Sequence, residues 1–100
     1  MEKLAPEFKA LSDKTRLKIM ELLVEGNYCV KALAEELGVS ESAVSQHLKK
    51  LREAGLVVGR KKSYWVHYSV RTESLKELAG KLEEWADRSE KDGQPCCQKV

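Results

Sequence analysis

The segment 30–56, VKALAEELGVSESAVSQHLKKLREAGL, constrains the fold more than any other part of the sequence. Its first part repeats apolar residues at helical spacing and then reaches Gly38, which favours a turn. Ser40 follows as a candidate N-cap of a second helical pattern, and Gly55 stands where a helix C-cap belongs. Two helices joined by a short turn that contains glycine are typical of a helix-turn-helix, whose second helix enters the DNA major groove.

The helix expected from Ser40 to Ala54 has an apolar side and a polar side. Glutamine can pair with adenine, serine can contact several base edges, and lysine can neutralise phosphate, so the polar side is predicted to read DNA. His47 lies at the border of the two sides, so either a phosphate contact or a half-buried histidine bonded to a neighbour is open. Burial is predicted for Val44, Leu48 and Leu51. DNA contacts are predicted for Ser42, Ser45, Gln46, His47, Lys49 and Lys50.

Positive charge is concentrated in this part of the chain. The formal net charge of the 100 residues is only +2, but residues 43–67 hold six Lys or Arg residues against a single Glu. Such a concentration around a predicted recognition helix is typical of a phosphate-binding surface. A solvated basic face without a partner is the alternative.

Residues 56–70, LVVGRKKSYWVHYSV, predict a β-hairpin. Two β-prone runs flank the segment 59–63, which is expected to form a basic tip. A helix-turn-helix followed by such a hairpin is a winged helix, and the basic tip residues are placed to reach the DNA backbone or minor groove. His67 is expected at the surface or at the root of the wing. The predicted wing contacts are Arg60, Lys61 and Lys62.

Helices are also predicted on both flanks. Leu4, Phe8 and Leu11 have helical spacing, and Ser12 is a candidate N-cap for a helix that Gly26 ends. That second helix is expected to bury Leu17, Met20, Leu23 and Val24. Thr72 is expected to cap the last helix, whose apolar residues are Leu75, Leu78, Ala79, Leu82, Trp85 and Ala86.

The predicted fold is therefore mainly helical with a small β-hairpin: four helices, two strands and a final helix, as a winged helix-turn-helix. The first and last helices are expected to form the seam of a homodimer. Residues 1–90 are expected to be one DNA-binding and dimerisation domain, and residues 91–100 a flexible tail that carries Cys96 and Cys97. No paired carboxylates, nucleophile–base pair or phosphate loop suggests an enzyme.

The cellular compartment of the protein and the redox state of its cysteines are inferred from features that the sequence lacks. No stretch approaches the roughly 18 consecutive apolar residues of a membrane span, and the N-terminal residues contain no long apolar signal core. We expect a cytoplasmic protein without a membrane partner. Three cysteines are an odd number, which suits thiols or metal ligands better than a disulfide framework.

Residues 8–70 resemble the ArsR/SmtB family of prokaryotic winged-helix repressors, above all in ALSDKTRLKIMELL, in LAEELGVSESAVSQHLKKLREAGLV and in the hairpin. The resemblance implies a homodimer that binds a palindromic double-stranded operator and represses transcription. It also implies release by an effector, often a metal or metalloid ion. No cofactor is expected beyond that effector.

The cysteines bear on which effector acts. Metal-responsive members of the family carry a Glu-Leu-Cys-Val-Cys-Asp-Leu motif at the start of the third helix, and NYCVKAL here matches its first cysteine with Cys29 but has Lys31 in place of the second. The family's zinc site on the last helix needs histidine, and residues 72–90 contain none. Cys29 begins a helix, whose positive dipole end stabilises a thiolate, although a small buried hydrophobe is an equal alternative.

The adjacent tail cysteines complete a candidate site. Trivalent arsenic binds three sulfurs, which matches Cys29, Cys96 and Cys97, and some family members sense arsenite through vicinal cysteines near the C-terminus. The eight residues from Arg88 to Cys96 span at most about 26 Å, so the tail could close on Cys29 of either subunit. Arsenite, As(III), is the predicted effector.

Other functions stay open. The same fold could sense thiol oxidation or persulfide, or Cd(II) or Pb(II) with an added carboxylate or water ligand. A more distant alternative is a winged-helix protein-interaction module without a DNA role.

Overall fold

The fold is mainly helical, with one two-stranded antiparallel sheet, as the sequence predicts. The computed structural model describes the backbone of residues 2–91 and the side chains of residues 2–90. The elements are the 3-10 helix η1 (Glu2–Leu4), helices α1 (Ala5–Leu11), α2 (Lys14–Glu25), α3 (Val30–Leu37) and α4 (Glu41–Glu53), strands β1 (Val57–Lys62) and β2 (Trp65–Val70), and helix α5 (Thr72–Lys91). The predicted tail, apart from the backbone of Lys91, lies outside the described residues, so the division at residue 90 stays a prediction.

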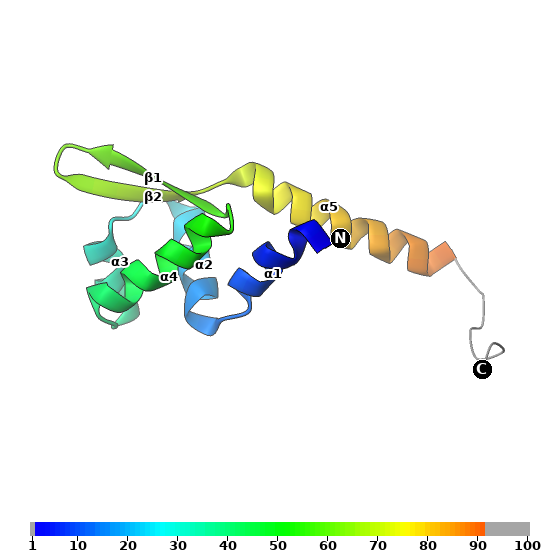
Figure 1. Ribbon diagram of the computed structural model, residues 1–100, viewed down its shortest axis with the longest axis horizontal. Helices are drawn as coiled ribbons and strands as arrows, with labels where there is room; N and C mark the ends of the chain where they lie inside the picture. The colour runs from blue at the N-terminus through cyan, green and yellow to red at the C-terminus, as the bar shows by residue number, and fades with distance from the viewer. Residues whose placement is uncertain (1, 92–100) are drawn as a thin grey trace.

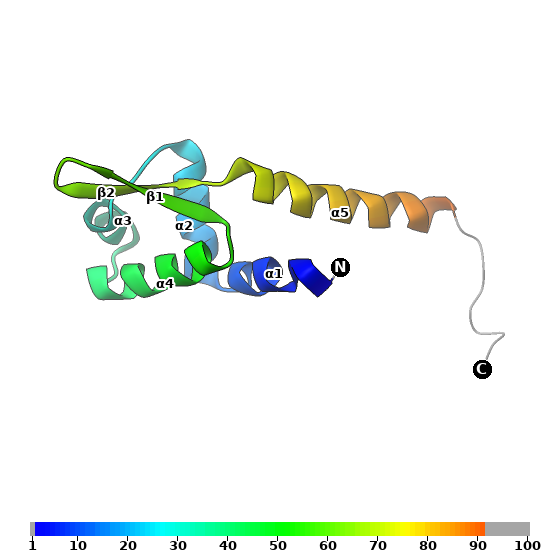
Figure 2. The ribbon, with the colours of Figure 1, turned by 45° about the horizontal axis from the view of Figure 1, so that its top comes forward.

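The elements divide into a body and an arm. Helices α1 to α4 pack together, and the hairpin lies along one side of them (Figure 1). In both Figure 1 and Figure 2, α5 leads away from the body in the direction opposite to the hairpin tip. No helix of the described residues has the length and apolar content needed to cross a membrane.

The core lies where α2, α3, α4 and the start of β1 meet. The apolar side of α4 is confirmed, since Val44, Leu48 and Leu51 are at most 1% exposed. Ile19 of α2 and Leu33 of α3 are 0% exposed and belong to the same cluster. Burial of large aliphatic side chains is the main stabilising term of a domain this small, so α4 is held firmly with its other side outward.

Gly55 ends α4 in a Schellman motif. Its φ of +79° lies in the left-handed region, its N–H donates to the carbonyl of Arg52 at 2.9 Å, and the Leu56 N–H donates to the carbonyl of Leu51 at 2.9 Å. Leu51 and Leu56 are both 0% exposed, so the apolar contact that accompanies this motif is buried. The chain therefore leaves α4 at a fixed angle and enters β1.

We expect Gly55→Ala to lower the free energy of unfolding by about 1 kcal/mol, because alanine is strained at positive φ. Gly80→Ala is the matched control, since Gly80 is an exposed helical residue with open space around it. That substitution should raise the free energy of unfolding by roughly 0.5–1 kcal/mol. Urea unfolding at one protein concentration measures both; equal effects of the two substitutions would contradict the prediction.

Two predictions for α2 are wrong. Asp13, not Ser12, is the N-cap, and its Oδ2 accepts a hydrogen bond from the Arg16 backbone N–H at 3.0 Å. Ser12 instead ends α1, where its Oγ donates to the Lys9 carbonyl at 2.7 Å. Serine and aspartate cap equally well, so the sequence did not distinguish the two registers.

The buried side of α2 is also different from the predicted one. Met20 and Leu23 are buried as expected, but Leu17 is 48% and Val24 64% exposed, and Ile19 is buried in their place. Leu17 and Val24 are seven residues apart and share a line roughly a quarter turn from the buried residues. Because α2 is apolar on more than one side, periodicity alone could not choose the side that faces the core.

The hairpin turn lies further along the chain than predicted. The strands pair from Val57 with Val70 to Lys62 with Trp65, so only Ser63 and Tyr64 form the turn. The predicted tip residues 59–62 belong to β1. Tyr64 at the tip is 93% exposed. Lysine and arginine are not strong β-formers, but pairing with the β-prone run of β2 keeps them in the strand.

Helix α5 is buried only in its first part. Leu78 is 5% exposed, and the Ser74 Oγ donates to the Gly55 carbonyl at 2.5 Å, which fixes the start of α5 to the end of α4. Further along, Leu82 is 49% and Trp85 44% exposed. The described chain therefore leaves the distal apolar face of α5 uncovered.

Candidate nucleic-acid interface

The outward side of α4 presents the polar side chains that the sequence predicts as DNA contacts. Of these, Ser42, Ser45, Gln46, Lys49 and Lys50 are exposed. This side faces outward because the opposite side of α4 is buried in the core. The result is a helix surface with serine, amide and ammonium groups free to reach base edges and phosphates.

The start of α4 is held by the turn before it. Gly38 ends α3 with φ +69°, and its N–H donates to the Ala34 carbonyl at 2.9 Å. Ser40 is the N-cap of α4, as predicted, and its Oγ accepts a hydrogen bond from the Ala43 N–H at 3.0 Å. The N-terminal end of α4 carries the positive end of the helix dipole, which favours a nearby phosphate.

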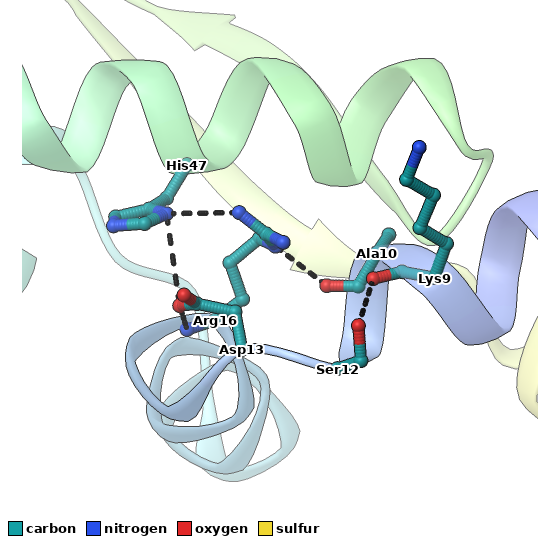
Figure 3. Close-up of polar contacts among 6 residues, drawn as sticks. All are labelled: Lys9, Ala10, Ser12, Asp13, Arg16 and His47. Atoms are coloured by element: carbon teal, nitrogen blue, oxygen red, sulfur yellow. Dashed lines mark hydrogen bonds and ion pairs between the residues drawn. The ribbon is translucent and has the colours of Figure 1, made fainter.

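His47 is half-buried and faces α2 rather than solvent. Its Nδ1 lies 3.3 Å from Arg16 Nη1 and 3.9 Å from Asp13 Oδ2 (Figure 3). Arginine has donors only, so Nδ1 accepts in the shorter contact and a neutral ring then carries its proton on Nε2. The approach of Asp13 becomes an ion pair only when the ring is protonated. The half-buried alternative describes this histidine, and its DNA contact stays a prediction.

Arg16 and Asp13 connect three helices through this cluster. The Arg16 Nε donates to the carbonyl of Ala10 at 2.5 Å, which ties α2 to the end of α1 (Figure 3). The hydrogen bond from the Arg16 backbone N–H lowers the pKa of Asp13, and the nearby charge of Arg16 lowers it further. The sequence pattern did not predict this cluster. The only local signal was an aspartate at a capping position three residues before an arginine.

The basic residues of the wing are exposed but divided between two faces of the hairpin. Arg60 pairs with His67 and Lys62 with Trp65, so those four side chains share one face. Lys61 pairs with Val66 on the other face. A single approach to DNA therefore cannot use all three basic side chains in the same way, and their contacts stay a prediction.

Cys29 is the N-cap of α3 and is half-buried. Its side chain makes no capping hydrogen bond and its thiol is free. Cys96 and Cys97 lie outside the described residues. Within residues 2–90, no three His, Cys, Asp or Glu side chains are grouped closely enough to hold a metal ion. The predicted three-cysteine site is therefore untested by the described geometry.

Known proteins with similar sequences and folds are transcriptional regulators. Residues 13–58 match the sequence profile described as bacterial regulatory protein, arsR family. The chain is 37% identical over 86 residues to the arsenic resistance transcriptional regulator of Pseudomonas putida, which covers 78% of this chain and 67% of that protein.

Solved structures with similar folds agree with these sequence matches. An ArsR-like transcriptional regulator from Rhodococcus sp. RHA1 superposes with a TM-score of 0.82 at 32% identity, over 90% of this chain and 85% of that one. The homodimeric winged helix-turn-helix DNA-binding domain from Mycobacterium bovis has a TM-score of 0.72 at 30% identity, over 86% of this chain and 80% of that one.

Proposed function

The chain belongs to the ArsR family of bacterial regulatory proteins, and we propose that it is a homodimeric repressor released from its operator by arsenite bound to Cys29, Cys96 and Cys97. As a member of that family it is a DNA-binding transcription regulator with a winged helix-turn-helix. The observation that carries the effector proposal is the position of Cys29, which begins the first helix of the helix-turn-helix. An ion held there acts on the element that positions α4.

The uncovered face of α5 supports a dimer. Leu82 and Trp85 together form an apolar surface on an arm that the body does not cover. Exposed apolar surface of this kind marks association sites. The similar domain from Mycobacterium bovis is homodimeric. Two copies that pair through α5 in antiparallel orientation bury this face and carry their two α4 helices on a common dimer.

Chain length supports closure of the tail on the partner subunit. Helix α5 has 20 residues and is about 28 Å long, and it leads away from the hairpin root beside which Cys29 lies. Five residues from Lys91 to Cys96 span at most about 17 Å, which is too short to return to Cys29 of the same chain. In an antiparallel dimer the end of the partner's α5 lies near the start of this subunit's α5. The distance from the partner's tail to Cys29 of this subunit is then short.

The mechanism follows from this geometry. Three sulfurs around arsenic would tie the partner's tail to the start of α3, and the dimer would then be held with its two α4 helices out of step with successive major grooves. Linkage requires DNA to weaken arsenite binding by the same factor by which arsenite weakens DNA binding. Each As–S bond would replace one As–OH bond of arsenous acid, and the thiol proton would leave with that hydroxide as water, with no change of oxidation state.

We expect arsenite to lower the affinity of the full chain for DNA by about 5- to 150-fold, the range of coupling free energies typical of allosteric sites. The DNA is a duplex selected by the protein from a random palindromic pool, and fluorescence anisotropy measures the affinity. Cys29→Ser, Cys96→Ser and Cys97→Ser should each lose most of the response while they keep the affinity without arsenite.

Diamide is the matched control for oxidation, since only a thiol-redox sensor needs an oxidant. Release by diamide and not by arsenite would favour the redox alternative. An arsenite response that survives in all three serine variants would eliminate the three-cysteine site.

A further inference from the structure

Cys29 and His67 are distant in sequence, but each follows or precedes a residue of a bridge that joins their two segments. Tyr28 forms an isolated antiparallel bridge with Tyr68 of β2. The Tyr28 N–H donates to the Tyr68 carbonyl at 3.3 Å, and the Tyr68 N–H donates to the Tyr28 carbonyl at 2.8 Å. Because the two segments run in opposite directions, Cys29, which follows Tyr28, lies opposite His67, which precedes Tyr68.

This pairing places the two residues on the same face. The backbone of Cys29 is extended, with φ −90° and ψ 169°, so the strand geometry continues through it before α3 begins. Residues opposite one another in an antiparallel pair have Cβ atoms about 4.5–5.5 Å apart. Cys29 and His67 are both half-buried, on the side of β2 opposite to Tyr68, whose ring packs on the core.

His67 has an unsatisfied nitrogen at this position. Its Nδ1 is buried, and it has no hydrogen-bond partner in the part of the chain that the structure describes. A buried polar atom without a partner costs free energy, so such an atom in a folded protein calls for an explanation. A bound cation that accepts the nitrogen lone pair would provide one.

We propose that Cys29 and His67 are paired ligands of a divalent cation that takes mixed sulfur and nitrogen ligands, such as Zn(II) or Cd(II). A tetrahedral ion with bonds of about 2.3 Å to sulfur and 2.0–2.1 Å to nitrogen fits between neighbouring side chains of this separation. On binding, the Cys29 thiol releases its proton to solvent and the neutral His67 ring donates a lone pair. Neither residue changes oxidation state.

Water fills the two remaining positions of the ion. A nitrogen ligand distinguishes this site from the three-sulfur arsenite site. Cys29 would bind arsenite together with other sulfur ligands, and it would bind a divalent ion together with the His67 nitrogen. An ion held by both residues joins the wing to the start of the helix-turn-helix, two elements that both flank the DNA-binding surface.

Titration of the full chain with Cd(II) tests the site. The full-length chain carries the joint substitution Cys96→Ser, Cys97→Ser, which leaves Cys29 as its one cysteine, so sulfur-to-cadmium charge-transfer absorbance reports the Cys29 bond. Competition with a chelator gives the affinity. We expect His67→Gln to lower the Cd(II) affinity by at least the roughly 10- to 100-fold seen when a residue that supports a ligand is lost. Cys29→Ser should lower it as much or more. His47→Gln is the matched control, because the chain has only two histidines, and it should bind Cd(II) like the wild type.

A measurement on the wild type does not depend on whether the variants fold. In the wild type, Cd(II) should shift the imidazole nitrogen resonances of His67 and leave those of His47 unchanged. Equal Cd(II) affinity with and without His67→Gln in the Cys96→Ser, Cys97→Ser chain, or an unshifted His67 resonance, overturns the proposal.

The joint variant Cys96→Ser, Cys97→Ser separates this site from the proposed function. If that variant still loses Cd(II) affinity on His67→Gln but has no arsenite response, the pair is supported and the tail acts only in arsenite binding. If the wild type responds to arsenite but His67→Gln leaves Cd(II) binding unchanged, the proposed function stands and the pair is refuted.

Discussion

We expect the joint substitution Leu82→Ala, Trp85→Ala to convert the proposed dimer into monomers and to weaken binding to a palindromic DNA site by about 100-fold or more. Both side chains are nearly half exposed on the arm that α5 forms, so their loss costs the isolated chain little core packing. A dimer binds its second half-site intramolecularly, and this gain, typically 10²–10⁴, disappears when the subunits separate. Analytical ultracentrifugation measures the mass, and anisotropy the DNA affinity.

Leu17→Ala, Val24→Ala is the matched control for that variant. These residues of α2 are exposed to a similar or greater extent, at 48% and 64%, but lie on a different surface. The control variant should stay dimeric and keep its DNA affinity. A dimer that persists without Leu82 and Trp85, or that is lost in the control, would place the interface elsewhere.

The second large effect is expected at the exposed side of α4. Gln46→Ala should lower the affinity for the selected DNA by about 1–3 kcal/mol per half-site and relax the preference at one base position, since a bidentate pair to adenine is lost. Lys49→Ala should weaken binding to all sequences alike and flatten the dependence on salt by about 0.9 per lost phosphate contact. Both side chains are exposed, so the free energy of unfolding should change by less than about 0.5 kcal/mol.

Lys76→Ala on α5 is the control for charge, because Lys76 is exposed and lies outside the predicted DNA surface. Its salt dependence should equal that of the wild type. Equal specificity of Gln46→Ala and wild type across a panel of single-base variants would show that this glutamine reads no base. Unchanged affinity in both α4 variants would favour the protein-interaction alternative.

Local patterns predicted most of the fold correctly. The spacing of Val44, Leu48 and Leu51 identified both the helix and its buried side, because a helix places residues three and four apart on one face. Ser40 and Gly55 marked the ends of α4 for equally local reasons: a side-chain cap at one end and a left-handed residue at the other. The exposed side of α4, with Ser45 and Gln46, followed from the same periodicity.

The errors arose where several local solutions have similar free energies. Ser12 and Asp13 can each cap α2, and packing of Arg16 against α1 and α4 selects Asp13. Apolar residues lie on more than one side of α2, so the side buried depends on where its neighbours pack. The turn of the wing lies at Ser63 and Tyr64 and not at the predicted basic residues, because pairing with β2 extends β1 through Lys62. The sequence alone does not show this pairing.

The sequence by itself determined the order of the elements and the exposed polar face of α4, because both are encoded in short-range periodicity and capping, and its resemblance to ArsR/SmtB motifs pointed to the family. Only the tertiary structure decided the neighbours of the two histidines. His47 contacts Asp13 and Arg16 at the start of α2, and the bridge between Tyr28 and Tyr68 joins the segments that hold Cys29 and His67. These contacts join segments far apart in the chain, and no pattern within either segment specifies which distant residue it will face.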